Sequence, residues 1–294
     1  MTRRQVLTAA SAAMAWGALG AERTSARQEP TPTRVRGAAG RITSRLGIQA
    51  GVVRAALTRD FDGTLKRLAE IGYTAIEWQW YGGNFGRTPS QLRTAVARAG
   101  LRGPSALVHA GTLLVGWERH IAAAKEAGIE SLAVVNLTED ERQSIADWHE
   151  WADRFNRAGE VARKAGLWLA LHNEPGFMDP IEGRIPYDAF VERTDPALVA
   201  LELDIGNLTR AGHDPVAYLR KYADRCRLFH LKDLPPAGEE GDRELGAGRV
   251  DFRRILSAVP HPDEVSFFVE HRADPDAPFD SVRRSFAHLA MLGI

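Results

Sequence analysis

The chain has 294 residues, of which 44% are hydrophobic and 26% charged, so it is long enough to fold as one large domain or two small ones. Its formal net charge is zero, which excludes the strongly basic surface of a nucleic-acid-binding protein and a general attraction to anionic membranes. Cys226 is the only cysteine, so the sequence also excludes an intrachain disulfide and a zinc site built from several cysteines. We therefore expect a small-molecule partner and no nucleic acid.

The first 27 residues have the pattern of an export signal. Arg3 and Arg4 precede an Ala-rich apolar stretch, residues 6–21, and small residues follow where a signal peptidase can cut. A disordered arm or a single membrane anchor is the alternative, but the stretch is too short and too rich in Ser, Thr and Gly for a spanning helix. We expect a twin-arginine-type signal over residues 1–27, a Pro-, Gly- and Arg-rich linker over 28–44, and an exported protein in the periplasm or outside the cell, without stable membrane association after signal removal.

From residue 45 onward, eight short apolar runs alternate with eight amphipathic segments. The predicted strands are residues 46–50, 75–80, 103–109, 131–137, 167–172, 198–204, 227–232 and 265–271. The predicted helices are residues 60–72, 88–100, 116–128, 148–166, 186–194, 214–223, 251–259 and 279–292, several of them ending in Ala-Gly or Ile-Gly. This alternation predicts a single α/β domain over residues 45–294, a (β/α)₈ TIM barrel. A dinucleotide-binding fold is disfavoured, because no G-x-G-x-x-G follows the first strand.

Polar side chains lie at the ends of the predicted strands: Glu77, His109, Asn136, His172, Asp204, His230 with Lys232, and Glu270. In TIM barrels the active site forms at the carboxyl ends of the strands, so these side chains converge there. Any one of them alone is more often a cap or an ion-pair partner. Predicted strands five to eight, however, end in four consecutive metal-ligand types: His172, Asp204, His230 and Glu270. Mixed nitrogen and oxygen donors predict one divalent metal ion, Mn²⁺, Zn²⁺ or Co²⁺.

Residues 185–233, "IPYDAFVERTDPALVALELDIGNLTRAGHDPVAYLRKYADRCRLFHLKD", closely resemble the sugar phosphate isomerase/epimerase family, whose fold is the xylose isomerase-like TIM barrel. The resemblance extends over nearly all of residues 46–294, including "GYTAIEW", "GAGRVDF" and "FFVEH". It implies a metal ion held by residues of strands five to eight, and Asp204, His230 and Glu270 match that pattern. His172 stands where sugar epimerases of the family place a glutamate, a departure that is similar to members acting on 3-keto-glycosides by elimination.

The resemblance implies a metal-dependent sugar isomerase or epimerase that removes the proton next to a keto-sugar carbonyl and forms an enediolate. The alternatives are a 3-keto-glycoside lyase or hydratase on the same site, and a sugar-binding barrel without catalysis. A phosphodiester endonuclease on this barrel is disfavoured, because neither its further metal ligands nor a basic DNA-binding face is visible. A homo-oligomer is compatible with the sequence, which does not set the oligomeric state.

Three residues are candidates for catalysis. Glu270 is the expected base, because one carboxylate oxygen can bind metal while the other faces the substrate. His109 is an alternative base, or a structural residue. Lys232 lies two residues after His230 and therefore on the same face of the strand, where it can stabilise an oxyanion or pair with a strand-end carboxylate.

Four residues are candidates for contact with the substrate: Glu77, Trp80, Asn207 and Arg272. An aromatic ring such as that of Trp80 can stack on a sugar, although barrel packing is its commoner role. Asn207 can contact sugar hydroxyls or can belong to a turn. Arg272 follows the last strand and can bind an anion.

Overall fold

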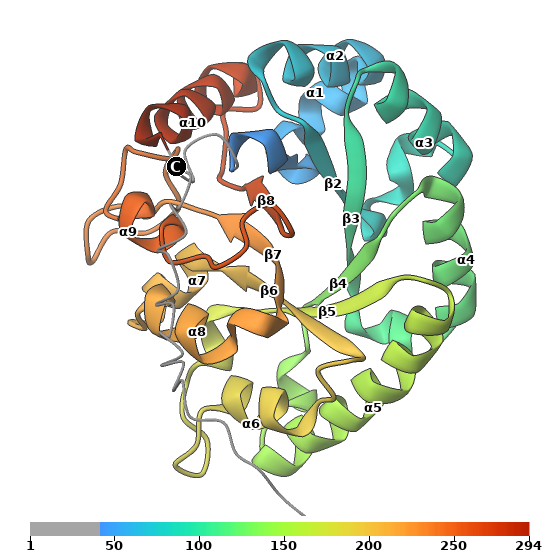
Figure 1. Cartoon of the computed structure of the whole chain (residues 1–294), viewed down its shortest axis with the longest axis vertical. Helices are drawn as coiled ribbons and strands as arrows, with labels where there is room; N and C mark the ends of the chain where they lie inside the picture. Colours follow the sequence, from blue (N-terminus) through green and yellow to red (C-terminus); the bar gives the residue numbers. More distant parts are fainter. Residues whose placement is uncertain (1–41, 294) are drawn as a thin grey trace, which may run out of the picture. The chain divides into compact units, whose positions relative to one another are not determined.

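The computed structural model describes residues 42–293. Within them, eight parallel strands form one closed barrel in chain order, with β8 paired to β1. The strands are β1 (Leu46–Gln49), β2 (Ala75–Gln79), β3 (Arg102–His109), β4 (Ser131–Val135), β5 (Trp168–His172), β6 (Val199–Asp204), β7 (Cys226–Leu231) and β8 (Ser266–Val269). The predicted (β/α)₈ barrel is confirmed (Figure 1).

Helices surround the barrel on its outer face (Figure 1). They are α1 (Arg54–Arg59), α2 (Phe61–Ile71), α3 (Pro89–Arg98), α4 (Trp117–Ala127), α5 (Ile145–Lys164), α6 (Pro186–Arg193), α7 (Ile205–Arg210), α8 (Pro215–Tyr222), α9 (Phe252–Leu256) and α10 (Pro278–Leu292). The longest, α5, begins three residues before the predicted start, because Ser144 and Asp147 form a capping box there. The short helices α1 and α7 were not predicted.

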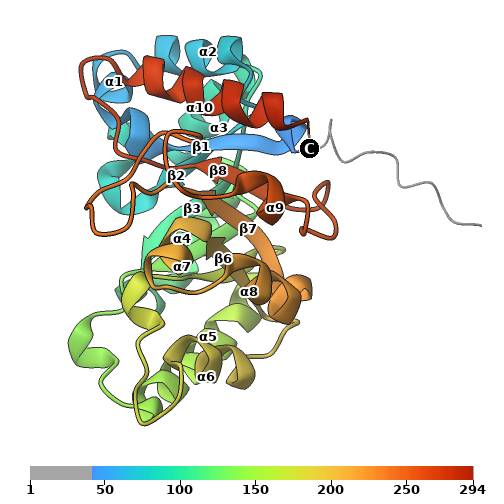
Figure 2. The same ribbon diagram turned by 90° about the vertical axis from the view of Figure 1, so that its left-hand side faces the viewer.

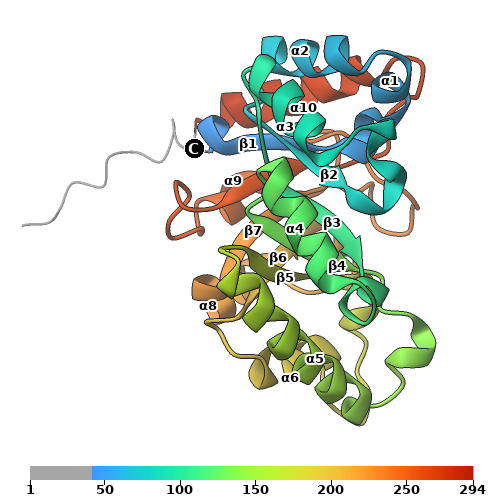
Figure 3. The ribbon, with the colours of Figure 1, turned by 90° about the vertical axis from the view of Figure 1, so that its right-hand side faces the viewer.

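The last helix closes the ring, and α10 lies next to α1 and α2 in Figure 1 and Figure 2. The Tyr73 hydroxyl donates a hydrogen bond of 2.9 Å to the Val282 carbonyl, and the Tyr73 ring contacts Phe286 edge-on. Figure 3 shows α3, α4 and α5 following one another over the opposite side of the barrel. Helices therefore cover the strands around the ring, and the open ends of the barrel remain for a site.

Small side chains fill much of the barrel interior. Ala75, Ala133, Ala170 and Ala200 are buried there together with a few larger residues such as Phe268. Successive inward positions on a strand are two residues apart. On most of the strands that carry these alanines, the next inward residue toward the carboxyl end has an ionisable side chain. A layer of ionisable side chains therefore lies above the apolar layer.

The predicted signal, residues 1–27, and most of the predicted linker, residues 28–44, lie outside the described residues and stay predictions. The described chain starts with Ile42, which is buried in the apolar core, and with a short 3₁₀ helix over Thr43–Arg45. Within residues 42–293, no helix is both long enough and apolar enough to cross a membrane.

Candidate metal centre and active site

The carboxyl ends of β5 to β8 bring the four predicted ligands together. Strand pairing places His172 beside Glu202 and Asp204 beside His230. Glu270 follows β8 directly, and its backbone N–H donates to the Leu231 carbonyl of β7 at 3.0 Å. The pairing of β5 to β8 thus brings the ends of these four strands together.

Asp204, His230 and Glu270 form one group of possible ligands, with donor atoms within 4.8 Å of one another. Nδ1 of His230 lies 2.7 Å from Oε2 of Glu270. The ammonium group of Lys232 lies 3.0 Å from Oδ2 of Asp204 and 3.3 Å from Oε2 of Glu270. Lys232 thus contacts the same oxygens that a metal ion at this position would use.

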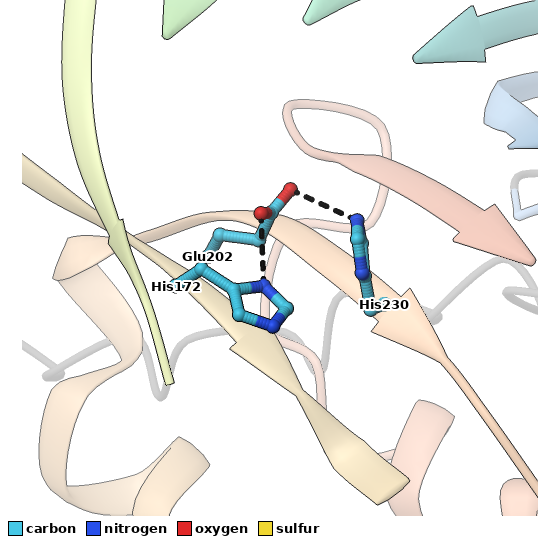
Figure 4. Close-up of side chains that lie close together, drawn as sticks. All are labelled: His172, Glu202 and His230. Carbon is cyan, nitrogen blue, oxygen red and sulfur yellow. Dashed lines mark hydrogen bonds and ion pairs between the residues drawn. The ribbon is translucent and has the colours of Figure 1, made fainter. Parts of the chain in front are cut away.

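His172 joins this group through Asp204 and joins a second group through Glu202. Its Nε2 lies 3.7 Å from Oδ2 of Asp204. Its Nδ1 lies 3.1 Å from Oε2 of Glu202, whose other oxygen is 3.4 Å from Nε2 of His230 (Figure 4). Glu202 therefore lies between the two imidazoles, and His172, Glu202 and His230 form the second group of possible ligands.

Asp204 is held in place by its neighbours on β5 and α7. Its backbone N–H donates to Oδ1 of Asn173 at 2.8 Å, and the Asn173 amide donates back to the Asp204 carbonyl. Oδ1 of Asp204 accepts the backbone N–H of Asn207 as the N-cap of α7. Only Oδ2 of this carboxylate is left to face the cluster.

Burial and neighbouring charges shift the pKa values of the acids in the cluster. Burial, together with the neighbouring Glu202 carboxylate, raises the pKa of Glu77 to about 8, although His230 acts in the opposite direction. Burial alone would raise the pKa of Glu270, but Lys232 and then His230 hold it well below its ordinary value. The pKa of Glu202 is also lowered, because His230 and His172 outweigh its burial.

The bases of the cluster respond to the same carboxylates. Burial alone would lower the pKa of His230, but the surrounding carboxylates, Glu202 first, raise it well above its ordinary value. The pKa of His172 is raised against burial by its hydrogen bond to Glu202. The pKa of Lys232 is raised against burial by Asp204 and then Glu270. Several side chains with shifted pKa values, gathered at one end of a barrel, are typical of a functional site.

The donor set fits a divalent transition metal. Oδ2 of Asp204 is completely buried, and the groups nearest to it are the Lys232 ammonium at 3.0 Å and Nε2 of His172 at 3.7 Å. When both histidines are neutral, as metal ligands must be, the buried carboxylates outnumber the one lysine and favour a cation. Two imidazole nitrogens and two carboxylate oxygens are ligands that Zn²⁺, Mn²⁺ and Co²⁺ accept. The predicted ligand set, His172, Asp204, His230 and Glu270, supplies such donors, and Glu202 forms a second possible group with both histidines.

Comparison with known proteins identifies the family. The family described as xylose isomerase-like TIM barrel matches residues 65–291, more than three quarters of the chain. The chain belongs to this family. The inosose dehydratase of Geobacillus kaustophilus is 28% identical over 203 residues, which cover 59% of this chain and 62% of that protein. The chain thus spans about three fifths of the length of this curated relative.

Solved structures of xylose isomerase-like barrels superpose on this one. A sugar phosphate isomerase/epimerase from Parabacteroides distasonis gives a TM-score of 0.72 at 24% identity, covering 83% of this chain and 93% of that one. The IOLI protein with a bound zinc atom gives a TM-score of 0.66 at 14% identity, covering 84% of this chain and 98% of that one. At these identities the likeness establishes the shared fold.

Of the other predicted site residues in this xylose isomerase-like barrel, Glu77 and Asn207 lie in the cluster. Glu77 is completely buried, with Oε2 2.5 Å from Nε2 of His230. The Asn207 amide donates to the Asn173 carbonyl at 2.9 Å and lies 3.5 Å from Nε2 of His172. Both side chains contact the predicted ligands or their neighbours.

Three further predicted residues lie in other surroundings. His109 is exposed at the end of β3. Trp80 is half-buried and packs against the core between helices and strands. Arg272 is exposed and lines a surface pocket of about 440 Å³ between the loops that follow β7 and β8.

Sequence reasoning missed Glu202. It was overlooked because Asp204, the last residue of β6, was taken as the metal ligand of that strand. The signal was present in "ELD", because residues two apart on a strand share a face, so Glu202 points inward whenever Asp204 does.

Proposed function

We propose that this protein is a divalent-metal-dependent enzyme that removes the proton next to the carbonyl of a keto sugar or keto cyclitol and eliminates water. The family, the fit of the donor set to a metal ion and the likeness to an inosose dehydratase all support this class of reaction. The isomerase or epimerase predicted from the sequence shares the first step, the removal of that proton.

The observation that carries the proposal is the unequal exposure of the carboxylates in the cluster. The side chains of Glu77, Glu202 and Asp204 are completely buried, whereas the side chain of Glu270 is 26% exposed. Glu270 is therefore the cluster carboxylate that can reach a substrate. A single carboxylate serves one face of the reacting carbon, which suits elimination better than inversion.

The ligand set defined above would hold the metal ion. Bound there, a divalent metal supplies Lewis-acid polarisation of the substrate carbonyl. Lys232 places a positive charge 3.3 Å from Oε2 of Glu270, which keeps this carboxylate ionised and able to accept a proton. His172 occupies the strand-five position without adding a second carboxylate base.

Glu270 performs both proton transfers in the proposed elimination. It takes the proton from the carbon next to the carbonyl, and the electrons of that C–H bond form an enolate. The C–O bond on the following carbon then breaks, and the departing hydroxide takes the proton from Glu270 and leaves as water. The product carries a C=C bond conjugated to the carbonyl, and Glu270 is again ionised.

Isomerisation is the second candidate, and the position of His109 favours it. The exposed imidazole of His109 lies at the carboxyl end of β3, the same end of the barrel as Glu270. A second proton-transfer group there could return the proton to a different position of the substrate, and no water would then be lost.

The test uses the full-length protein loaded with Zn²⁺, Mn²⁺ or Co²⁺ and incubated with an inosose in D₂O. We expect loss of water, detected by mass spectrometry, and we expect Glu270→Gln to lower the rate by about 100-fold or more. Glu264→Gln is the matched control, because this exposed glutamate precedes β8 at the opposite end of the barrel. Deuterium uptake without loss of water would favour the isomerase instead, and full activity of Glu270→Gln would refute the assigned base.

A further inference from the structure

Glu202 contacts both histidines of the predicted ligand set but is not itself in that set. It is completely buried in the barrel interior, where neighbouring inward positions hold alanines. A buried carboxylate is costly unless its partners compensate for the lost hydration. The pairing of β6 with β7 shifts register between Leu201 and Glu202, and such irregularities redirect side chains.

The surroundings of His172 determine which ring nitrogen carries the proton. Nδ1 lies 3.1 Å from Oε2 of Glu202, an oxygen that accepts a hydrogen bond. Nε2 lies 3.5 Å from the amide nitrogen of Asn207, which is oriented by its hydrogen bond to the Asn173 carbonyl and can only donate. Nδ1 therefore carries the hydrogen, and the lone pair of Nε2 is directed toward the Asp204 side.

His230 is oriented in a corresponding way. Its Nε2 lies 2.5 Å from Oε2 of Glu77 and 3.4 Å from Oε1 of Glu202. Its Nδ1 lies on the other side of the ring, 2.7 Å from Glu270. The ring nitrogen that faces the interior thus meets buried carboxylates, and the opposite nitrogen faces the predicted metal position.

We propose that Glu202 is a positioning residue that holds both imidazoles so that Nε2 of His172 and Nδ1 of His230 face the metal ion. Figure 4 shows its two oxygens directed at the two rings. Glu77 assists from β2 by holding Nε2 of His230. A carboxylate behind a ligating histidine fixes the ring and its tautomer, and here one carboxylate does so for two histidines. The inference rests on the metal centre of the proposed function.

Metal affinity tests this role independently of turnover. Zinc binding to the full chain is measured by competition with a chromogenic chelator for the unaltered protein, Glu202→Gln and the control Glu264→Gln. We expect Glu202→Gln to weaken zinc binding by about 10- to 100-fold. The amide has only one oxygen, so it can face Nδ1 of His172 or Nε2 of His230 with an acceptor, but not both as the carboxylate does. The same substitution in a His172→Ala background is expected to have a smaller effect, because one of the two rings that Glu202 holds is then absent.

The tautomers themselves give a second readout that needs no variant. In ¹⁵N-labelled, zinc-loaded protein, long-range ¹H–¹⁵N spectra are expected to show His172 protonated at Nδ1 and His230 at Nε2. The opposite tautomers, or a change in zinc affinity of less than twofold in a folded Glu202→Gln protein, would overturn the proposal. Tight zinc binding with the expected tautomers but no turnover of a keto sugar would refute the proposed function and leave this role intact.

Discussion

The buried carboxylate of Asp233 holds the loop that follows β7, and its substitution gives a quantitative test of the structure. Oδ1 accepts the backbone N–H groups of Leu234 at 2.8 Å and Val250 at 3.0 Å. Oδ2 accepts those of Gly246 and Gly248, both at 2.9 Å. One side chain thereby ties the loop over residues 234–250 to the end of the strand that carries two of the site residues.

The substitution Asp233→Asn keeps the shape of the side chain but replaces one oxygen by an NH₂ group, which cannot accept. Whichever way the amide turns, two of the four N–H groups lose their acceptor. A buried donor without an acceptor costs about 1–3 kcal/mol, but the N–H groups of Gly246 and Gly248 are only partly buried, so the expected loss in the free energy of unfolding is about 1–3 kcal/mol. This is a large share of the roughly 5–15 kcal/mol that stabilises a typical protein.

The assay is urea unfolding of the metal-free protein, followed by tryptophan fluorescence. Asp251→Asn is the matched control, because exposed Asp251 caps α9 by accepting the Arg254 N–H at 2.9 Å, and asparagine caps a helix as well as aspartate does. We expect the control to stay within about 0.5 kcal/mol of the unaltered protein. A loss below about 1 kcal/mol for Asp233→Asn would show that this carboxylate does not hold the loop.

Three further predictions follow from the site and the core. Lys232→Met is expected to lower kcat by about 10-fold or more without lowering zinc content, since Nζ contacts the oxygens of Asp204 and Glu270 that the metal would use. Loss of zinc, measured by elemental analysis, would contradict this. His172→Glu is expected to raise the ratio of C3 epimerisation to elimination when keto sugars are assayed with Mn²⁺, because it adds a second carboxylate; an unchanged ratio of products would show that this position does not govern the reaction. The Cys226 thiol, whose pKa burial raises to about 12, is expected to react with a disulfide reagent at pH 8 only as the protein unfolds; rapid labelling of the folded protein would contradict its burial.

Much of the fold could be predicted from local sequence patterns. The eight strands were found because each is a short apolar run bounded by polar or turn-forming residues, and Gly128, for example, ends α4 in the left-handed conformation that favours glycine. The six-residue helices α1 and α7 were missed because a segment of that length is too short to display a helical period. Helix α7 starts at the ligand strand itself, where Asp204 serves as its N-cap.

The site was predicted only in part, because a strand end shows which side chains point into the barrel but not how deep in the barrel each one lies. His172, Asp204, His230 and Glu270 could be found from the rule that polar residues end barrel strands at the active site. Glu202 lies one inward position deeper, and its contacts depend on a register shift that the sequence does not display. Trp80 begins a 3₁₀ helix over Trp80–Gly86 directly after β2, and its side chain packs against the apolar core that contains Trp78.

We propose that one divalent metal ion is held at the carboxyl ends of β5 to β8. A crystal structure of the zinc-loaded full chain, with anomalous diffraction recorded at the zinc edge, tests it most directly. We expect one strong peak about 2.0–2.3 Å from Nε2 of His172, Oδ2 of Asp204, Nδ1 of His230 and a carboxylate oxygen of Glu270. Bound zinc located elsewhere, with these four side chains keeping only the protein contacts described above, would contradict it.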